Sequence, residues 1–514
     1  MISGAKIIRN FYRDSVALMR LSAHLSELRG VQQASAVMAS ANNLALLRDA
    51  GLLDGDVEAS PNDLLVALRA KDSATLAAAL AEAERELNEQ PESSTEAAPR
   101  REPPRSQEMG LELMPAANLA LISTPGEYAA AEALKALHLG LNVMLFSDNV
   151  SVEDEVMLKR YALAHDLMVM GPDCGTAIIS GIPLGFANAV RRGAIGIVGA
   201  SGTGLQLVSC LVDRLGGGIS QAIGTGGRDL SRDVGAITML QGVAALADDP
   251  ATKVIVLISK PPAPEVAARV LERARQARKP VVVNFLGADP ASMEGLGVTP
   301  VKTLEDAAFT AVALVTGQKP ESRVSVTSLP DLPSLAAGQR YIRGLYIGGT
   351  LCYEATLLLS EALPNVYSNT PVAGARALEN VWQSRAHTLV DLGDAVFTRG
   401  RPHPMIDPRL RNERLIAEVK DPQTAVILLD FVLGYGSHPD PASVVAPIIE
   451  TSIAQAAASG RHITVVGFVC GTAADPQHLQ TQEARLRKAG VQLASSNAEA
   501  VRLAATIASR ADRA

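Results

Sequence analysis

Two stretches decide the fold: GAIGIVGASGTGLQLVSCL at residues 193–211 and RGLYIGGTLCYEATLLL at residues 343–359. Each begins with a short apolar run, passes through a turn of glycine and threonine, and continues as a leucine-rich run with helical spacing. A buried strand followed by a glycine turn and a helix is typical of a βαβ unit in a parallel sheet. The two stretches therefore predict an α/β protein that contains two related parallel-sheet domains.

The likeness between the two halves extends beyond these stretches. DDPATKVIVLI at 248–258 pairs with KDPQTAVILLD at 420–430, and the strand-like KPVVVNFLG pairs with HITVVGFVCG. The main difference is the insertion DAVFTRGRPHPMIDPRLRNER, which lies where the first copy has the shorter RDLSRDVGA. This comparison predicts an internal duplication in which the second copy carries additional polar residues.

The chain has 514 residues, enough for about three to five domains of ordinary size. The sequence predicts a multidomain α/β chain divided as follows: a small α+β domain at 1–90, a linker at 91–112, parallel-sheet domains at 113–193 and 194–318, a second linker at 319–340, and a further parallel-sheet domain at 341–514. The linkers are inferred from their high content of Pro, Ser and charged residues.

Composition excludes several classes of protein. The formal net charge of -7 argues against nucleic acid as a partner and against attachment to a membrane surface. The amino terminus lacks the apolar core of a signal peptide, so we expect a cytoplasmic protein. The four cysteines lie far apart without a CxxC pair, which makes a disulfide framework or a structural zinc site improbable. We therefore expect no metal.

The first candidate site is the turn after the strand at 195–198. It comprises Gly199, Ser201, Gly202, Thr203 and Gly204. Ligands of open parallel sheets bind at the carboxyl ends of strands, where glycines let the backbone amides of the next helix approach a phosphate. The alternative is an ordinary turn capped by Ser201. Thr203 occupies the last position of a G-x-S-x-G nucleophile elbow, which disfavours acyl hydrolysis.

Two more turns belong to the same hypothesis of phosphate binding. Gly226, Gly227 and Arg228 follow the next strand of the first copy, and the second copy has its own turn of Gly348, Gly349 and Thr350. Arg228 is a candidate for holding an anion with two hydrogen bonds. The alternative interpretation makes Arg228 and Asp229 an exposed ion pair.

The second copy collects polar residues that are candidates for substrate binding. They are Asp391, Asp394, Arg401, His403, Asp430, Tyr435, Gly436 and His438. The set is able to bind a carboxylate, and His403 or His438 is a candidate for proton transfer, with Arg228 as a further catalytic candidate. Metal ligation and a solvated, turn-forming role are the alternatives. Cys174 follows a strand in VMGPDCGTA and is either a nucleophile or a packed thiol.

These strings also carry a family resemblance. LFSDNVSVEDE, MGPDCGTAI, AIGIVGASGTG, IGTGGRDLS, LISKPPAP and LDFVLGYGSHPDP resemble the FdrA family, whose fold is related to that of succinyl-CoA synthetase. The resemblance implies a Rossmann-like domain of the CoA-binding type at 113–193 and two flavodoxin-like ligase domains at 194–318 and 341–514.

The resemblance also implies functions. FdrA proteins are implicated as subunits of transcarbamylases in purine breakdown, such as the oxamate carbamoyltransferase of allantoin catabolism. Phosphate or carbamoyl phosphate is then a substrate, a ureido acid such as oxalurate is the other, and further subunits are partners. The alternatives are an acyl-CoA synthetase that binds CoA and a noncatalytic scaffold. The stretch ADPASMEGLGVTPVKTLEDAA lacks the relay histidine of nucleotide-forming synthetases, which favours the transcarbamylase.

Overall fold

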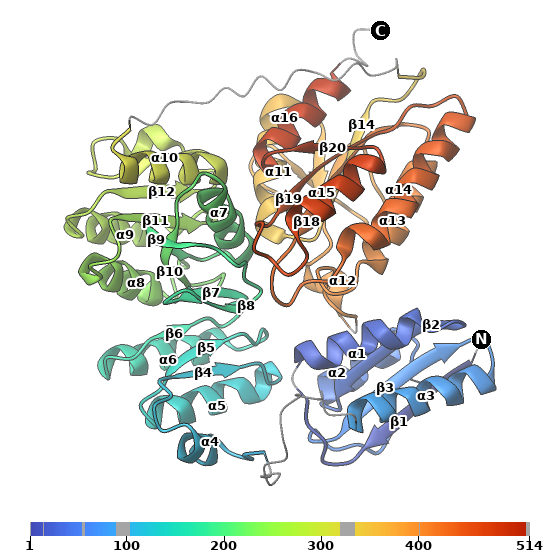
Figure 1. The fold of residues 1–514 in the computed structure, drawn as a ribbon, viewed down its shortest axis with the longest axis horizontal. Helices are drawn as coiled ribbons and strands as arrows, with labels where there is room; N and C mark the ends of the chain where they lie inside the picture. The colour runs from blue at the N-terminus through green and yellow to red at the C-terminus, as the bar shows by residue number, and fades with distance from the viewer. Residues whose placement is uncertain are drawn as a thin grey trace. The chain divides into compact units, whose positions relative to one another are not determined.

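The computed structural model describes residues 2–13, 15–53, 57–88, 103–318, 335–399 and 401–509. It divides into two compact units, which we treat separately (Figure 1). Unit 1 comprises residues 1–169 and 395–407, and unit 2 comprises residues 170–394 and 408–514. Most of both expected linkers, residues 91–102 and 319–334, lies outside the described residues.

Unit 1 begins with a small α+β domain, as expected for the first 90 residues. Its elements are β1 (Ile2–Ile8), α1 (Ser15–Glu27), β2 (Val31–Met38), α2 (Ala41–Asp49), β3 (Leu64–Ala70) and α3 (Ser73–Asn88). The strands form an antiparallel sheet in the order β1-β3-β2. Leucines at helical spacing, including Leu18, Leu21 and Leu25 of α1, pack on this sheet and form its core.

The second part of unit 1 is a small α/β layer. Its elements are α4 (Gln107–Leu113), β4 (Leu119–Ile122), α5 (Gly126–His138), β5 (Asn142–Leu145), α6 (Val152–Ala164) and β6 (Val169–Met170). The sheet has the order β4-β5-β6, and β4 and β5 run parallel. Small residues of α5, such as Ala129 and Ala133, allow the helix to approach the sheet closely. The short helix α12 (Ala395–Thr398) also belongs to unit 1.

The first sheet of unit 2 has the order β13-β12-β11-β9-β10-β7-β8. Its elements are β7 (Thr176–Ile179), β8 (Ile182–Gly185), β9 (Arg192–Gly199), α7 (Gly202–Arg214), β10 (Ile219–Gly224), α8 (Ile237–Asp248), β11 (Val254–Ser259), α9 (Pro264–Gln276), β12 (Val281–Phe285), the short 3₁₀ helix η1 (Pro290–Met293), β13 (Thr299–Pro300) and α10 (Leu304–Thr316). Strands β9 to β13 are parallel and have flavodoxin-like order. The antiparallel hairpin β7-β8 extends the edge of this sheet, although it falls within the stretch 113–193.

The second sheet of unit 2 repeats this plan in the order β16-β15-β17-β14-β18-β19-β20. Its elements are β14 (Tyr341–Tyr346), α11 (Gly349–Ala362), β15 (Val366–Ser368), β16 (Arg376–Ala377), β17 (His387–Asp391), α13 (Arg409–Lys420), β18 (Thr424–Val432), α14 (Pro441–Ala458), β19 (Thr464–Cys470), α15 (Leu479–Lys488), β20 (Val491–Ala494) and α16 (Asn497–Ala508). Strands β14, β18, β19 and β20 take the places of β9, β11, β12 and β13, as the duplication predicts. The predicted fold class, multidomain α/β with a small amino-terminal domain, is confirmed.

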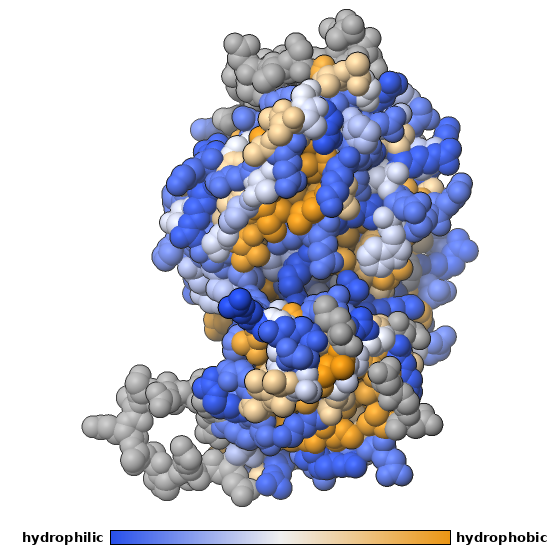
Figure 2. Space-filling view, turned by 90° about the vertical axis from the view of Figure 1, so that its right-hand side faces the viewer, coloured by the Kyte–Doolittle hydropathy of each residue, from blue (hydrophilic) through white to orange (hydrophobic). Residues whose placement is uncertain are grey.

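Helices cover both faces of each sheet of unit 2 (Figure 1). Helices α7 and α10 pack together on one face of the first sheet, α11 and α16 do so on the second sheet, and α7 also contacts α11. On the side of the molecule shown in Figure 2, hydrophilic side chains predominate and apolar ones appear between them. Within the described ranges, we find no helix with both the length and the apolar character that crossing a bilayer requires.

Candidate functional site: two helix amino termini that meet in unit 2

The turns after β9 and β14 lie against each other. Ser201 caps α7, because its side-chain oxygen accepts a hydrogen bond from the Gly204 amide at 2.9 Å. Helix α11 begins at Gly349, directly after Gly348. The Ser201 hydroxyl donates a 2.7 Å hydrogen bond to the hydroxyl of Thr350. The structure therefore brings together two turns whose residues Ser201 and Thr350 are 149 positions apart in the chain.

Both turns present features of an anion site. The first amides of a helix have no acceptor within the helix, and the helix dipole places partial positive charge there. Two such ends meet at the Ser201–Thr350 contact. The turns also need glycine: a Cβ at Gly349 would lie 2.7 Å from a carboxylate oxygen of Asp391, and one at Gly202 would lie 3.3 Å from the Thr176 hydroxyl. The arrangement suits a phosphate group approached closely by backbone.

Two carboxylates flank the α11 turn. Asp430 is fully buried near the end of β18 and accepts hydrogen bonds from the amides of Ile347 and Gly348, both at 2.8 Å. Burial raises its pKa to about 6. Asp391 ends β17 and accepts from the Gly393 amide at 2.9 Å. Burial raises its pKa to about 7, so Asp391 is partly protonated near neutral pH and is then a hydrogen-bond donor.

Two basic residues near this turn were not among the predicted site residues. Lys260 follows β11, and its charge opposes the rise in the pKa of Asp391. Its ammonium also lies 5.3 Å from the centre of the Tyr353 ring. Arg411 is buried in α13 and donates a 2.7 Å hydrogen bond to the backbone carbonyl of Asp430. A lysine directly after a buried strand is a usable sequence signal for Lys260, whereas Arg411 lies in a run of polar residues that looks exposed.

The turn after β10 is adjacent to the α7 turn, because the Thr225 amide donates to the Gly199 carbonyl at 2.9 Å. Gly226 packs against the Pro172 carbonyl, and Gly227 and Arg228 are exposed. Asp229 is not exposed: it is buried and accepts from the Thr238 and Met239 amides at the start of α8. Asp229 is therefore not an exposed turn residue, because its buried carboxylate caps α8.

The loop after β18 connects the two sheets of unit 2. The Tyr435 amide donates to the Ala187 carbonyl at 2.8 Å, and a Cβ at Gly436 would meet the Phe186 ring. The Tyr435 side chain is exposed, whereas His438 is partly buried and accepts from the Asp440 amide at 3.0 Å. These contacts give the loop a role in docking the sheets.

The remaining candidates fall in both units. Arg401 and His403 lie in residues 395–407, which belong to unit 1, whereas His438 belongs to unit 2. Asp394 is the last residue before that segment and is partly exposed. Cys174 is buried, with its sulfur 3.5 Å from the Gly224 carbonyl oxygen, which is the environment of a packed thiol.

Three family models match parts of the chain. They are a heavy-metal-associated domain of AllF at residues 1–103, a CoA-binding domain at 190–287 and a CoA-ligase at 345–507. The residues do not fit the heavy metal of the first model, because residues 1–103 contain no cysteine. Within the described part of the chain, no three His, Cys, Asp or Glu side chains come together as ligands.

Similar proteins include two subunits of a CoA ligase. The uncharacterized protein YahF of Escherichia coli is 46% identical over 495 residues, which is 95% of each chain. The alpha subunit of succinate–CoA ligase (ADP-forming) from Aquifex aeolicus is 30% identical over 33% of this chain and 57% of its own length, and the subunit from Methanothermobacter thermautotrophicus is 32% identical over 33% and 58%. Among solved structures, an acetyl-coenzyme A synthetase of Ca. Korarchaeum cryptofilum covers 77% of this chain and 84% of its own, with 17% identity and a TM-score of 0.32.

These findings correct one prediction. The chain was expected to be a carbamoyltransferase, and this is wrong, since the family models and the succinate–CoA ligase subunits indicate a ligase or synthetase of the CoA type. The absent relay histidine misled the prediction, because losing one catalytic group does not determine which reaction replaces it. Full-length similarity to YahF, together with the two CoA-related models, shows that this chain belongs to the YahF family, an FdrA-like family with succinyl-CoA synthetase-like domains.

Proposed function

We propose that the chain acts in a CoA-ligase reaction and that unit 2 holds the phosphate group of that reaction between the amino termini of α7 and α11. The contact of Ser201 with Thr350 carries the proposal, because it joins two helix ends of positive potential at one point. The matches to CoA-binding and CoA-ligase models over 190–287 and 345–507 include both turns and support it.

The residues suit the phosphate-bearing substrates of such a reaction. The first-turn amides of α7 and α11 are oriented donors, and the hydroxyl of Thr350, which accepts from Ser201, adds its own hydrogen. The Lys260 ammonium contributes positive charge near Asp391. CoA supplies a thiol as the acyl acceptor when it is bound, and the turns are where this chain would hold a phosphate group.

The missing histidine favours a reaction that starts from an acyl phosphate over one that passes through a phosphohistidine. Residues 286–303 contain no histidine that could carry a phosphoryl group. We therefore infer the half-reaction acyl phosphate + CoA → acyl-CoA + phosphate. A C–S bond forms at the acyl carbon, the C–O bond to phosphate breaks, phosphate leaves with the bonding electrons, and the thiol proton passes to a base. An ATP-using step would belong to another subunit, because unit 1 offers only two small domains within its described residues.

Removing the two hydroxyls tests the turn site. Isothermal titration calorimetry with inorganic phosphate should give an affinity at least about tenfold weaker for Ser201→Ala/Thr350→Val than for the unaltered chain, a loss of about 1.4 kcal/mol. Ser209→Ala/Thr356→Val is the matched control, since it removes buried hydroxyls of the same two helices that bond carbonyls within those helices. An equal phosphate affinity in both double variants would place phosphate elsewhere. A chain that binds no CoA in the same calorimeter would contradict the ligase.

The turn site should also depend on pH. Sulfate is a suitable probe because its own charge stays constant from about pH 5 to 9. Any change of its affinity with pH then comes from ionisable groups of the protein. Below its pKa of about 7, Asp391 is neutral, and above it the carboxylate repels an anion, so sulfate affinity should fall roughly tenfold from pH 6 to 8. Asp391→Asn should bind sulfate nearly equally at pH 7 and 8, and a persistent fall there would contradict the role of Asp391.

A further inference from the structure

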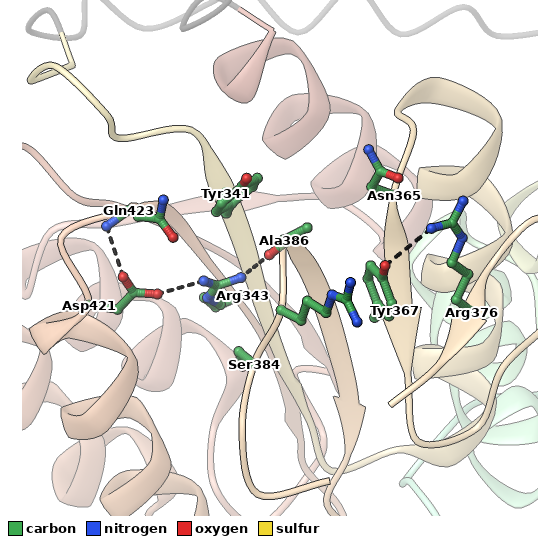
Figure 3. A pocket seen from close by; sticks show the side chains of 10 residues that line it. Tyr341, Arg343, Asn365, Tyr367, Arg376, Ser384, Ala386, Asp421 and Gln423 are labelled. Carbon is green, nitrogen blue, oxygen red and sulfur yellow. Dashed lines mark hydrogen bonds and ion pairs between the residues drawn. The ribbon is translucent and has the colours of Figure 1, made fainter. Parts of the chain in front are cut away.

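A pocket lies at the ends of the second-sheet strands that are opposite to the α11 turn. It has a volume of about 490 Å³, and Figure 3 shows the residues that line it: Tyr341, Arg343, Asn365, Tyr367, Arg376, Ser384, Arg385, Ala386, Asp421 and Gln423. Most of them precede or begin strands β14, β15, β17 and β18. Strand β14 spans six residues between this pocket and the α11 turn, or about 20 Å. The pocket is therefore distinct from the candidate site above.

The inner wall of the pocket is a compensated ionic network. Arg343 is almost fully buried, and its guanidinium lies 3.1 Å from Glu418 and 2.6 Å from Asp421. It also donates to the Ala386 carbonyl, so it joins β14 to the segments before β17 and β18 (Figure 3). Such a network holds the wall in one geometry, and its charge is neutralised.

The rim of the pocket carries charge that is poorly compensated. The guanidiniums of Arg376 and Arg385 lie 5.9 and 5.1 Å from the centre of the same Tyr367 ring. Arg385 is 3.6 Å from Glu379, but both side chains are largely exposed, so this pair contributes little. Among the described residues, Arg376 has no carboxylate within 4 Å, and it donates to the Tyr367 hydroxyl at 3.3 Å. Two like charges thus share one aromatic wall.

We propose that this pocket binds a phosphate-bearing small molecule. Arg376 and Arg385 hold the phosphate oxygens with their guanidinium donors, and Tyr367 provides a flat apolar wall for the rest of the ligand. The volume matches that of ordinary small-molecule sites. Both a simple phosphate compound and a nucleotide offer this chemistry. The proposal is independent of the function assigned to the turns of α7 and α11.

Trp382 provides a local readout of binding. It is the only tryptophan of the chain and precedes the pocket residues Ser384 and Arg385 by two and three positions. Titration of the full chain with inorganic pyrophosphate should change Trp382 fluorescence saturably below about 10 mM, with Arg376→Gln/Arg385→Gln weakening the affinity at least about tenfold. Arg275→Gln/Arg487→Gln is the control of equal charge, because both arginines are exposed and lie in unit 2.

Each outcome bears on the proposal. Ser201→Ala/Thr350→Val should leave the pyrophosphate titration of Trp382 unchanged, which separates this pocket from the turn site. The proposal is overturned if Trp382 fluorescence shows no saturable change and calorimetric heats do not respond to Arg376→Gln/Arg385→Gln. It is also overturned if the pocket variant and the control variant lose pyrophosphate affinity equally. ADP is the second probe. If ADP binds more tightly than pyrophosphate, and Tyr367→Leu reduces the ADP affinity to that of pyrophosphate, the ligand is a nucleotide. If ADP and pyrophosphate bind equally, the pocket recognises the phosphate group alone.

Discussion

Asp430→Ala is expected to lower the free energy of unfolding of unit 2 by about 3–5 kcal/mol. Asp430 is 0% exposed, and its carboxylate accepts from the amides of Ile347 and Gly348. Removing it leaves two buried donors unpaired and removes the negative charge that faces the buried guanidinium of Arg411. Denaturant unfolding followed by Trp382 fluorescence and circular dichroism measures the change, since Trp382 belongs to unit 2.

The matched control is another acidic residue of the same sheet domain. Glu483→Ala removes a carboxylate that pairs with exposed Arg487 at 3.5 Å, and it should cost less than about 1 kcal/mol. The loss in free energy of unfolding for Asp430→Asn should lie between those for Asp430→Ala and Glu483→Ala. The amide oxygen of the asparagine keeps one acceptor, while its NH₂ group faces a backbone donor. Equal unfolding midpoints for Asp430→Ala and Glu483→Ala would show that Asp430 does not hold the α11 turn.

Gly226→Ala should be the most damaging of the single-methyl changes at glycine turns. Gly226 has φ +84°, where alanine costs about 1–2 kcal/mol. A Cβ would also lie far inside van der Waals contact of the Pro172 carbonyl oxygen, and forcing backbone apart adds about 1–3 kcal/mol. The expected result is a loss of about 2–5 kcal/mol in the free energy of unfolding of unit 2, measured as for Asp430.

Gly216→Ala isolates the contact from the backbone conformation. Gly216 has φ +85°, nearly that of Gly226, yet no atom lies within 4 Å of the position its Cβ would take. Gly216→Ala should therefore lower the free energy of unfolding by only about 1–2 kcal/mol, which is the cost of the backbone conformation. If the two alanine variants unfold at the same denaturant concentration, the close approach of Gly226 to Pro172 does not stabilise the loop after β10.

The sheet architecture of unit 2 was predictable because its signals are local. The runs at 195–198 and 254–258 contain no polar side chain and end at Gly199 and Ser259, as is typical of buried parallel strands. The internal duplication then predicted that β14 and β18 occupy the positions in the second sheet that β9 and β11 occupy in the first. The hairpin β7-β8 was harder to place, because strand pairing depends on contacts with β10 that no local pattern encodes.

The candidate site was predictable only in part. The turns at 199–204 and 348–350 were found because glycine between a strand and a helix has a known use. Asp391 and Asp430 were found because each follows an apolar run in a buried strand next to β14. Lys260 and Arg411 were missed, since the effect of a charge on a site depends on distances across the sheet rather than along the chain.

The α/β class, the small amino-terminal domain and the two glycine turns follow from the amino-acid sequence, because strand burial, helix periodicity and turn chemistry are encoded in short windows of residues. The meeting of those turns was decided by the tertiary structure alone. Ser201 and Thr350 form a hydrogen bond only because the α7 and α11 helices of two duplicated domains pack together. The same holds for the pocket around Tyr367, since Arg376 and Arg385 both come to lie beside the Tyr367 ring through the pairing of β15 with β16 and β17.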